Sequence, residues 1–268
     1  MTESGSDSNS APLSTWRRHS AAFWVALQFL TTLPVRSVPN YSKPVLGLSL
    51  LYYPLVGLLI GGLLWLVALA STSLLTSLLS AALIVAAWTL LTGALHIDGL
   101  ADCADAWVGG FGDRERTLEL MKDPVSGPVA VATVVVVLLL KTAAVYELLL
   151  RFDAWWIVFA PLLGRAAPLM VFLSTPYIRK QGLGEVLAEN FSRGPAFTLL
   201  ILLALGMLLM APAVNLILLS TTLMGLFAMR SLMLRRLGGC TGDTIGATVE
   251  VVEVIALLAL VIGLPLML

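Results

Sequence analysis

The stretch GPVAVATVVVVLLLKTAAVYELLL, residues 127–150, decides the fold class of this 268-residue chain. It carries only two charged residues, Lys141 and Glu147, and a helix needs about 20 apolar residues to cross a bilayer. Six further apolar segments share its character: 44–70, 73–95, 154–174, 195–211, 213–229 and 245–267. Of the chain, 59% is hydrophobic and 12% charged, whereas a soluble domain is about 25% charged. We predict an all-α, polytopic integral membrane bundle of about seven transmembrane helices.

The N-terminal region differs from these segments. Residues 16–34, WRRHSAAFWVALQFLTTLP, begin with one aromatic and two basic residues, which favours a helix lying in the membrane interface over a span. The first fifteen residues are polar and rich in serine, and they lack the basic start and apolar core of a signal peptide. We expect residues 1–15 to be a disordered tail and 16–268 to form a single membrane-embedded domain.

The basic residues indicate how the helices are oriented. If the N-terminus is cytoplasmic, the cytoplasmic segments hold 13 of the 16 Lys and Arg residues and the outer loops hold only Arg151. The thirteen are Arg17, Arg18, Arg36, Lys43, Arg114, Arg116, Lys122, Arg179, Lys180, Arg193, Arg230, Arg235 and Arg236. Basic residues accumulate on the cytoplasmic side, so we predict a cytoplasmic N-terminus and a periplasmic C-terminus in a bacterial-type inner membrane. The zero net charge gives no sign of a nucleic-acid partner.

An acidic cluster lies between two of the predicted spans. Residues 93–123 contain seven of the chain's 16 acidic residues, among them Asp98, Asp102 and Asp105. On a helix these three lie within about 60° of one another, and carboxylates so close repel unless a cation sits among them. Oxygen ligands select Mg²⁺, Ca²⁺ or Mn²⁺, and Mg²⁺ usually shares its carboxylates with a substrate phosphate. The pattern predicts a metal site for a phosphate-bearing substrate; a solvated acidic loop is the alternative.

Residues flanking the cluster are further candidates. His96 is either a structural hydrogen-bonding group or an acid–base group. The turn Gly109–Gly112 can fold residues 113–126 back over the cluster, which makes Lys122 and Asp123 candidate substrate contacts.

A second polar motif, GGCTGDTIGATVEVVE, occupies residues 238–253. Thr241 or Asp243 is expected to cap the helix that follows, whose N-terminus favours anions. Asp243, Glu250 and Glu253 share one face of that helix. Acids inside a span mark a site unless they pair with a basic residue.

Two basic residues fall within predicted spans. Arg165 must face acids, a polar cavity or substrate phosphate, because an isolated arginine at mid-membrane costs at least about 2.5 kcal/mol. Lys141 and Glu147 are expected to reach the outer boundary and to be structural. Cys103 and Cys240 match no zinc spacing and are expected to be free thiols.

Four segments together resemble the cobalamin synthase family: FLTTLPV at 29–35, HIDGLADCADA at 96–106, MKD at 121–123 and the motif at 238–253. The resemblance implies a polytopic, Mg²⁺-dependent membrane enzyme that joins adenosylcobinamide-GDP to α-ribazole or its 5′-phosphate and releases GMP. It implies Mg²⁺ at Asp98, Asp102 and Asp105, with one Asp or His96 taking a proton. The substrate contacts it implies are Lys122, Asp123, Arg165, Thr241, Asp243, Glu250 and Glu253.

Other classes of membrane protein share parts of this pattern. A CDP-alcohol phosphotransferase also uses aspartates on a cytoplasmic helix, but its Asp-Gly-x-x-Ala-Arg sequence is not found after Asp98-Gly99. An aspartate-rich prenyltransferase would need a second aspartate motif. An ion-coupled transporter can use Arg165, Glu250 and Glu253 within spans, yet no internal repeat is visible. A homo-oligomer is compatible with the sequence.

Overall fold

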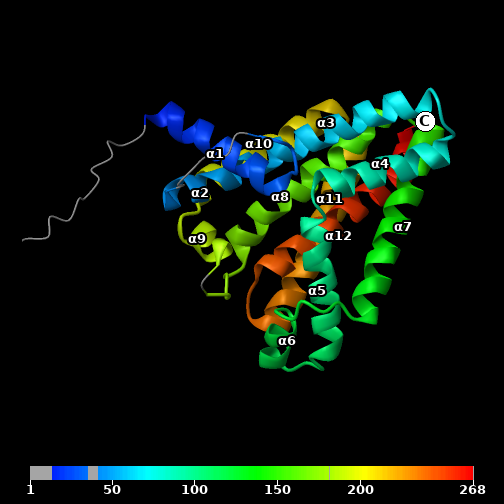
Figure 1. Ribbon diagram of the computed structural model, residues 1–268. Helices are drawn as coiled ribbons and strands as arrows, with labels where there is room; N and C mark the ends of the chain where they lie inside the picture. Colours follow the sequence, from blue (N-terminus) through cyan, green and yellow to red (C-terminus); the bar gives the residue numbers. More distant parts are fainter. Residues whose placement is uncertain (1–13, 36–41, 181, 268) are drawn as a thin grey trace, which may run out of the picture.

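The regular elements of the chain are helical throughout the residues that the computed structural model describes, which are 14–35, 42–180 and 182–267 (Figure 1). The elements are α1 (Thr15–Leu30), α2 (Lys43–Ser49), η1 (Leu50–Tyr52), α3 (Tyr53–Thr72), α4 (Ser77–Leu91), α5 (Leu95–Gly109), α6 (Arg114–Leu120), α7 (Pro128–Arg151), η2 (Ala154–Val158), α8 (Phe159–Ser174), α9 (Leu183–Glu189), α10 (Arg193–Met210), α11 (Pro212–Leu237), α12 (Gly242–Gly263) and η3 (Leu264–Met267). The predicted tail, 1–15, lies almost wholly outside the described residues.

Six helical segments in the described part of the chain are long and apolar enough to cross a membrane: Lys43–Thr72, Pro128–Arg151, Ala154–Ser174, Arg193–Met210, Pro212–Leu237 and Gly242–Leu266. The pair α4 and α5 passes the same test together, but its two helices are bent by 89°. The prediction of a polytopic helical membrane bundle is therefore confirmed, with a bent pair in place of the straight span expected over 73–95.

The bend between α4 and α5 has a local cause. Gly93 and Ala94 have φ angles of +59° and +55°, a left-handed conformation that ends α4 and redirects the chain. The last carbonyls of α4 are satisfied from outside, because the Thr32 backbone N–H donates to Leu91 O at 2.8 Å and its hydroxyl donates to Leu90 O at 2.9 Å. As a result, α5 leaves the axis of α4 and presents the acidic motif.

The most buried spans are α8 and α12. In the most apolar part of the spans that contain them, 78% and 61% of residues are buried inside the protein, against 11% in the span of α10. Leu169 on α8 and Val252 and Leu257 on α12 are completely buried in the main hydrophobic core. Because α5, α7, α8 and α11 all pack against α12, that helix is the axis around which the bundle and its polar groups are arranged.

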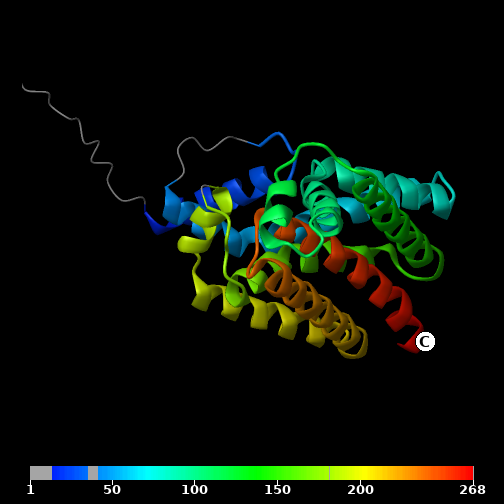
Figure 2. The same cartoon turned by 90° about the horizontal axis from the view of Figure 1, so that it is seen from below.

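The polar motifs gather at one end of the bundle. The turn between α11 and α12 lies opposite the C-terminus (Figure 2). Backbone hydrogen bonds from Ile178 N to Cys240 O, 3.0 Å, and from Cys240 N to Pro176 O, 2.8 Å, join residues 175–180 to that turn. Since α5 packs against α12, the two sequence motifs and the 175–180 segment lie at the same end.

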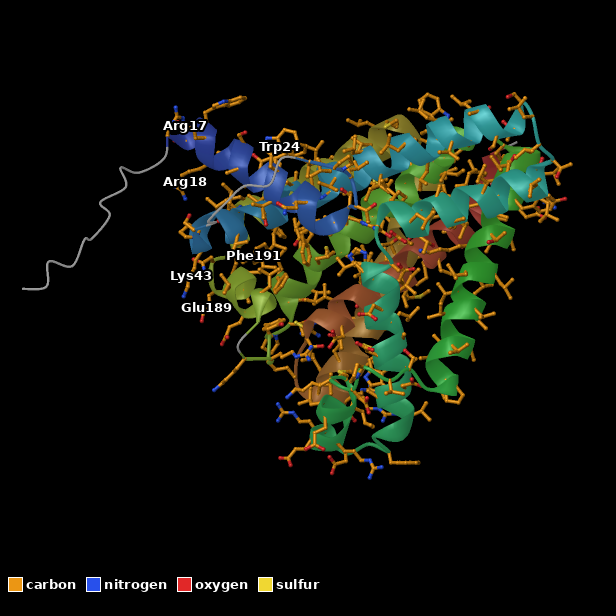
Figure 3. The ribbon with its side chains drawn as sticks, in the orientation of Figure 1. Arg17, Arg18, Trp24, Lys43, Glu189 and Phe191 are labelled. Atoms are coloured by element: carbon orange, nitrogen blue, oxygen red, sulfur yellow. The ribbon has the colours of Figure 1, made fainter. Side chains whose placement is uncertain are left out.

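The N-terminal helix α1 is amphipathic and shorter than the spans. Its buried face includes Ala26 and Leu30, while Trp16 is 80% exposed. Arg17 and Arg18 project from its first turn, and Trp24 projects further along (Figure 3). The predicted helix is present, and its position in the membrane interface stays a prediction.

Candidate functional site

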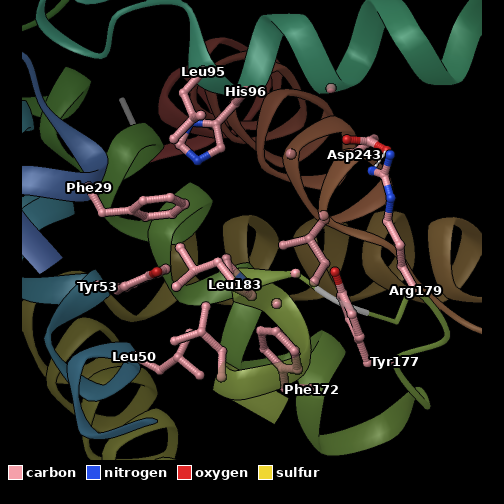
Figure 4. A pocket seen from close by; sticks show the side chains of 18 of the residues that line it. Phe29, Leu50, Tyr53, Leu95, His96, Phe172, Tyr177, Arg179, Leu183 and Asp243 are labelled. Carbon is pink, nitrogen blue, oxygen red and sulfur yellow. Dashed lines mark hydrogen bonds and ion pairs between the residues drawn. The ribbon is translucent and has the colours of Figure 1, made fainter. Parts of the chain in front are cut away.

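A cavity of about 450 Å³ lies where α5, the first turns of α12 and the 175–180 segment meet (Figure 4). One part of its wall is polar and consists of His96, Asp98, Arg179 and Asp243. The other part is apolar, with Phe29, Leu50, Tyr53, Phe172, Leu183 and Leu187 among its residues. A site of this size and mixed character suits an organic ligand that carries a charged group.

A close crossing of α5 and α12 positions the carboxylates. A Cβ atom at Gly99 would lie only 2.8 Å from Asp243 O and 3.1 Å from Asp243 Cα, so only glycine allows this approach. The neighbouring Asp98 and the Asp102 one turn later are thereby brought close enough to Asp243 for electrostatic repulsion. The two motifs that are separate in sequence thus form one site.

Asp98 and Asp102 have no hydrogen-bond or ion-pair partner among the described residues. Asp243 is paired with a cation, because Arg179 Nη1 donates to its Oδ2 at 2.8 Å, and the Thr241 side chain also hydrogen-bonds to it. Three carboxylates and one guanidinium leave two net negative charges, which a divalent cation would neutralise. No complete group of three metal-binding His, Cys, Asp or Glu side chains occurs among the described residues. Two free carboxylates nevertheless fit Mg²⁺, which takes one or two carboxylates together with phosphate oxygens and water.

Asp105 has a different environment from the other two acids of its helix. Its carboxylate accepts backbone hydrogen bonds from Gly127 and, at 2.9 Å, from Ala130, in the first turn of α7. A carboxylate there satisfies N–H groups that lack partners within the helix and interacts favourably with the helix dipole. Asp105 thus joins α5 to α7, and its role as a metal ligand stays a prediction.

Thr241 and Asp243 divide the two roles expected at the start of α12. The Thr241 hydroxyl accepts from Thr244 N at 3.3 Å, and the Thr244 hydroxyl accepts from Thr241 N at 2.9 Å. This reciprocal capping box confirms the capping prediction for Thr241, which is buried. Asp243, in the first turn, faces the cavity instead (Figure 4).

A buried ion network lies deeper in the bundle. Lys141 Nζ is 2.6 Å from Glu250 Oε2 and 2.5 Å from Glu253 Oε2, and Arg165 pairs with Glu253. Each of these four residues is at most 3% exposed, and their charges sum to zero. The pairing of Arg165 with an acid of α12, considered from the sequence, is present.

The expected position of Lys141 was wrong. Instead of reaching the outer boundary with Glu147, its side chain points inward, and Nζ also lies 4.5 Å from the centroid of the Trp88 ring. The reason is that α7 packs against α12, and burial in lipid-like surroundings makes the two glutamates of α12 better partners than distant headgroups. Glu147 pairs with Arg151 instead, at 2.8 Å.

His96 connects this network with the cavity. Its Nδ1 lies 3.4 Å from Arg165 Nη2, and its ring lines the cavity (Figure 4). Because a guanidinium can only donate, Nδ1 acts as an acceptor in this contact, and the neutral ring carries its proton on Nε2. Arg165 therefore reaches the site through His96, since it is itself 1% exposed and does not line the cavity.

Lys122 and Asp123 lie away from the cavity lining. Both are exposed in the turn between α6 and α7, where the Asp123 carboxylate accepts from Val125 N at 3.0 Å. The preceding glycine turn does fold α6 back, but against the end of α5, where Thr117 approaches Gly110.

Sequence reasoning missed Arg179 as a site residue and counted it only among the cytoplasmic basic residues. Its signal was its position: the segment Thr175–Lys180 follows a span and ends on the same side as the motif at 238–253. Cys240, in the turn joined to this segment, is buried and free as expected, and burial raises the pKa of its thiol to about 12. A thiol with that pKa stays protonated at neutral pH and is unreactive.

Comparisons with known proteins agree with these motifs. Residues 22–261 match the sequence model of the family described as cobalamin-5-phosphate synthase. A relative from Pseudomonas syringae pv. syringae, named adenosylcobinamide-GDP ribazoletransferase, is 52% identical over 241 residues, which cover 89% of this chain and 98% of the relative. A relative of the same name from Pseudomonas entomophila is 53% identical over 252 residues, covering 91% of this chain and 98% of the relative.

A third relative of that name, from Stutzerimonas stutzeri, is 52% identical over 236 residues, covering 88% of this chain and 96% of the relative. No solved structure matches the chain. The resemblance that the motifs indicated is thus confirmed. The chain belongs to the cobalamin-5-phosphate synthase family of membrane enzymes.

Proposed function

We propose that this protein joins adenosylcobinamide-GDP to α-ribazole, or to α-ribazole 5′-phosphate, and releases GMP. The names of its relatives support the substrates. The observation that carries the proposal is the pair of carboxylates without partners, Asp98 and Asp102, which lie close to Asp243 at a cavity whose wall includes Asp98, Asp243 and the Arg179 guanidinium. Such a site suits transfer at a diphosphate, where catalysis consists mainly of positioning and charge neutralisation.

In the proposed reaction, the phosphate attached to cobinamide is transferred from GMP to a ribose hydroxyl of α-ribazole. A ribose hydroxyl of α-ribazole attacks the phosphorus attached to cobinamide, a new O–P bond forms, and the bond from that phosphorus to the GMP oxygen breaks. The hydroxyl proton passes to a carboxylate of the site; His96 becomes an alternative acceptor only when its Nδ1 is released from Arg165. When bound, Mg²⁺ would neutralise charge on the diphosphate, and Asp98 and Asp102 would hold the ion. The family pattern implies Asp105 as a third ligand, but both of its oxygens accept from the start of α7, so we give it the smaller role.

The remaining residues have supporting roles in this proposal. His96, in contact with Arg165, faces the cavity with a side chain able to contact a phosphate or ribose oxygen. Glu250 and Glu253 hold Arg165 and Lys141 in place. We further propose that the site lies on the cytoplasmic face of the inner membrane, because the positive-inside rule favours that orientation.

The substrate can be tested with the full-length protein purified in detergent. Given adenosylcobinamide-GDP, α-ribazole and Mg²⁺, it should release GMP, and omission of α-ribazole or addition of EDTA should reduce the rate to background. Transfer from a CDP-linked lipid to an alcohol, without any reaction of the corrinoid substrate, would instead support the CDP-alcohol phosphotransferase alternative.

A further inference from the structure

Arg179 is the one Lys or Arg side chain that lines the cavity among the residues that the structure describes. It lies in the 175–180 segment, and its guanidinium points across to Asp243 on α12 (Figure 4). The side chain is 33% exposed and that of Asp243 is 19% exposed, so both are accessible from the cavity. Arg165, by contrast, is 1% exposed and held by Glu253.

The backbone around Arg179 is fixed independently of its side chain. Ile178 N donates to Cys240 O at 3.0 Å, and Cys240 N donates to Pro176 O at 2.8 Å. The guanidinium can therefore change partner without displacing the segment that carries it. Both side chains are only partly buried, so the guanidinium can exchange Asp243 for another anion that enters the cavity.

The charges of the site favour such an exchange. Asp243 is the only one of the three clustered carboxylates that has a cationic partner among the described residues. A divalent cation placed among these carboxylates would satisfy them and repel the guanidinium, which then needs another anion. Because its planar fork binds phosphate oxygens through two parallel hydrogen bonds, a diphosphate in the cavity is a suitable new partner.

We propose that Arg179 is a diphosphate-binding residue that is paired with Asp243 while the site is empty and is released when cation and diphosphate enter. The inference rests on the proposed function, since it names the residue that binds the diphosphate of that substrate. It makes Arg179 both a competitor of the cation and a contact of the substrate. A purely structural arginine would have neither property.

Manganese binding to the substrate-free protein tests the first property. Full-length wild-type protein, R179Q and the control K180Q are titrated with Mn²⁺, and free Mn²⁺ is measured by electron paramagnetic resonance. Lys180 is the matched control because it is the adjacent exposed cation and does not line the cavity. R179Q should bind Mn²⁺ about tenfold more tightly than wild type, since a competing positive charge has gone, whereas K180Q should be unchanged.

Steady-state kinetics on the same proteins test the second property. R179Q should raise the KM for adenosylcobinamide-GDP about 10- to 100-fold while leaving the KM for α-ribazole unchanged, and R179K should lie between R179Q and wild type. R179K also keeps the positive charge, so it provides the test if R179Q does not fold, and it should then bind Mn²⁺ as wild type does.

The outcomes separate this inference from the proposed function. If wild type binds Mn²⁺ and transfers, but R179Q matches K180Q in Mn²⁺ affinity or in KM, the role of Arg179 is wrong and the function stands. If R179Q does not fold and R179K leaves the KM for adenosylcobinamide-GDP unchanged, the role is likewise wrong. If wild type neither binds Mn²⁺ nor transfers, the proposed function itself fails.

Discussion

Lys141 lies between two carboxylates, Glu250 and Glu253, in the interior of the bundle. With Arg165 these residues form a neutral group of four charges, so the network is balanced only while all of its members remain. Removing one partner from a buried ion pair leaves a charge without compensation and costs about 3–5 kcal/mol. Deleting a second charge of opposite sign restores the balance.

This balance leads to a prediction for paired substitutions. Lys141→Met should destabilise the protein by about 3–5 kcal/mol, whereas the double variant Lys141→Met/Glu250→Gln should be more stable than Lys141→Met alone. Chemical denaturation in detergent, followed by circular dichroism, measures both, with the exposed Lys180→Met as control. Additive destabilisation by the two substitutions would show that Lys141 and Glu250 do not act as a pair.

At this scale the sequence predicted the chemistry of several residues better than their partners. The position of Arg165 in the middle of a span correctly predicted an acidic neighbour, and the capping role predicted for Thr241 is confirmed. The error on Lys141 arose because position along a span does not determine which face of the helix points inward. Arg179 was missed because the sequence does not show that this loop residue lies next to Asp243, which is far away along the chain.

Helix α5 owes its position to contacts at both ends. Gly93 and Ala94 turn it away from α4, and Asp105 attaches it to the start of α7. A run of apolar residues up to 95 predicted a straight span, because hydropathy registers composition and not the left-handed turn. The spacing of the acids did predict one helical face, but two of them face Asp243 and the third caps α7.

This division of roles within α5 predicts different effects of equivalent substitutions. Asp105→Asn keeps one of the two oxygens that accept from the start of α7 and replaces the other by an NH₂ group that cannot accept, so it should weaken this joint but retain activity within about tenfold of wild type. Asp102→Asn removes a charge with no other partner and should lower kcat by about 100-fold or more, or about 2.7 kcal/mol. The two variants are compared by their rates of GMP release at saturating Mg²⁺. An equal loss of rate in both would show that Asp105 is as important to the metal site as Asp102.

The whole molecule was predictable in its broad outline. Seven apolar segments and the distribution of basic residues predicted a helical membrane bundle with its polar motifs at one end, as the described helices and the α11–α12 turn show. The meeting of residues 98–102 with residue 243 was not derivable from spacing, because it depends on a crossing that Gly99 permits. Pairs of residues that approach each other at such a helix crossing are identified only from the three-dimensional structure.

The orientation of the bundle gives a prediction at the same scale. A single cysteine introduced at the C-terminus of a variant lacking Cys103 and Cys240 should react with a membrane-impermeant maleimide added to intact cells, because the C-terminus is expected to be periplasmic. A cysteine at residue 119 on α6, an exposed position at the same end of the bundle as the site (Figure 1), should react only after the cells are opened. The opposite labelling pattern would invert the proposed sidedness.

The most direct test of the central claim measures the Mg²⁺ dependence of GMP release in three variants: Asp98→Asn, Asp102→Asn and Glu119→Gln. Asp98 and Asp102 belong to the carboxylate cluster with Asp243, whereas Glu119 is an exposed acid of α6 outside that cluster. We expect the two aspartate variants to lose about 100-fold or more in rate and to need more Mg²⁺, and Glu119→Gln to match wild type. Full activity with an unchanged Mg²⁺ requirement in both aspartate variants would contradict the account.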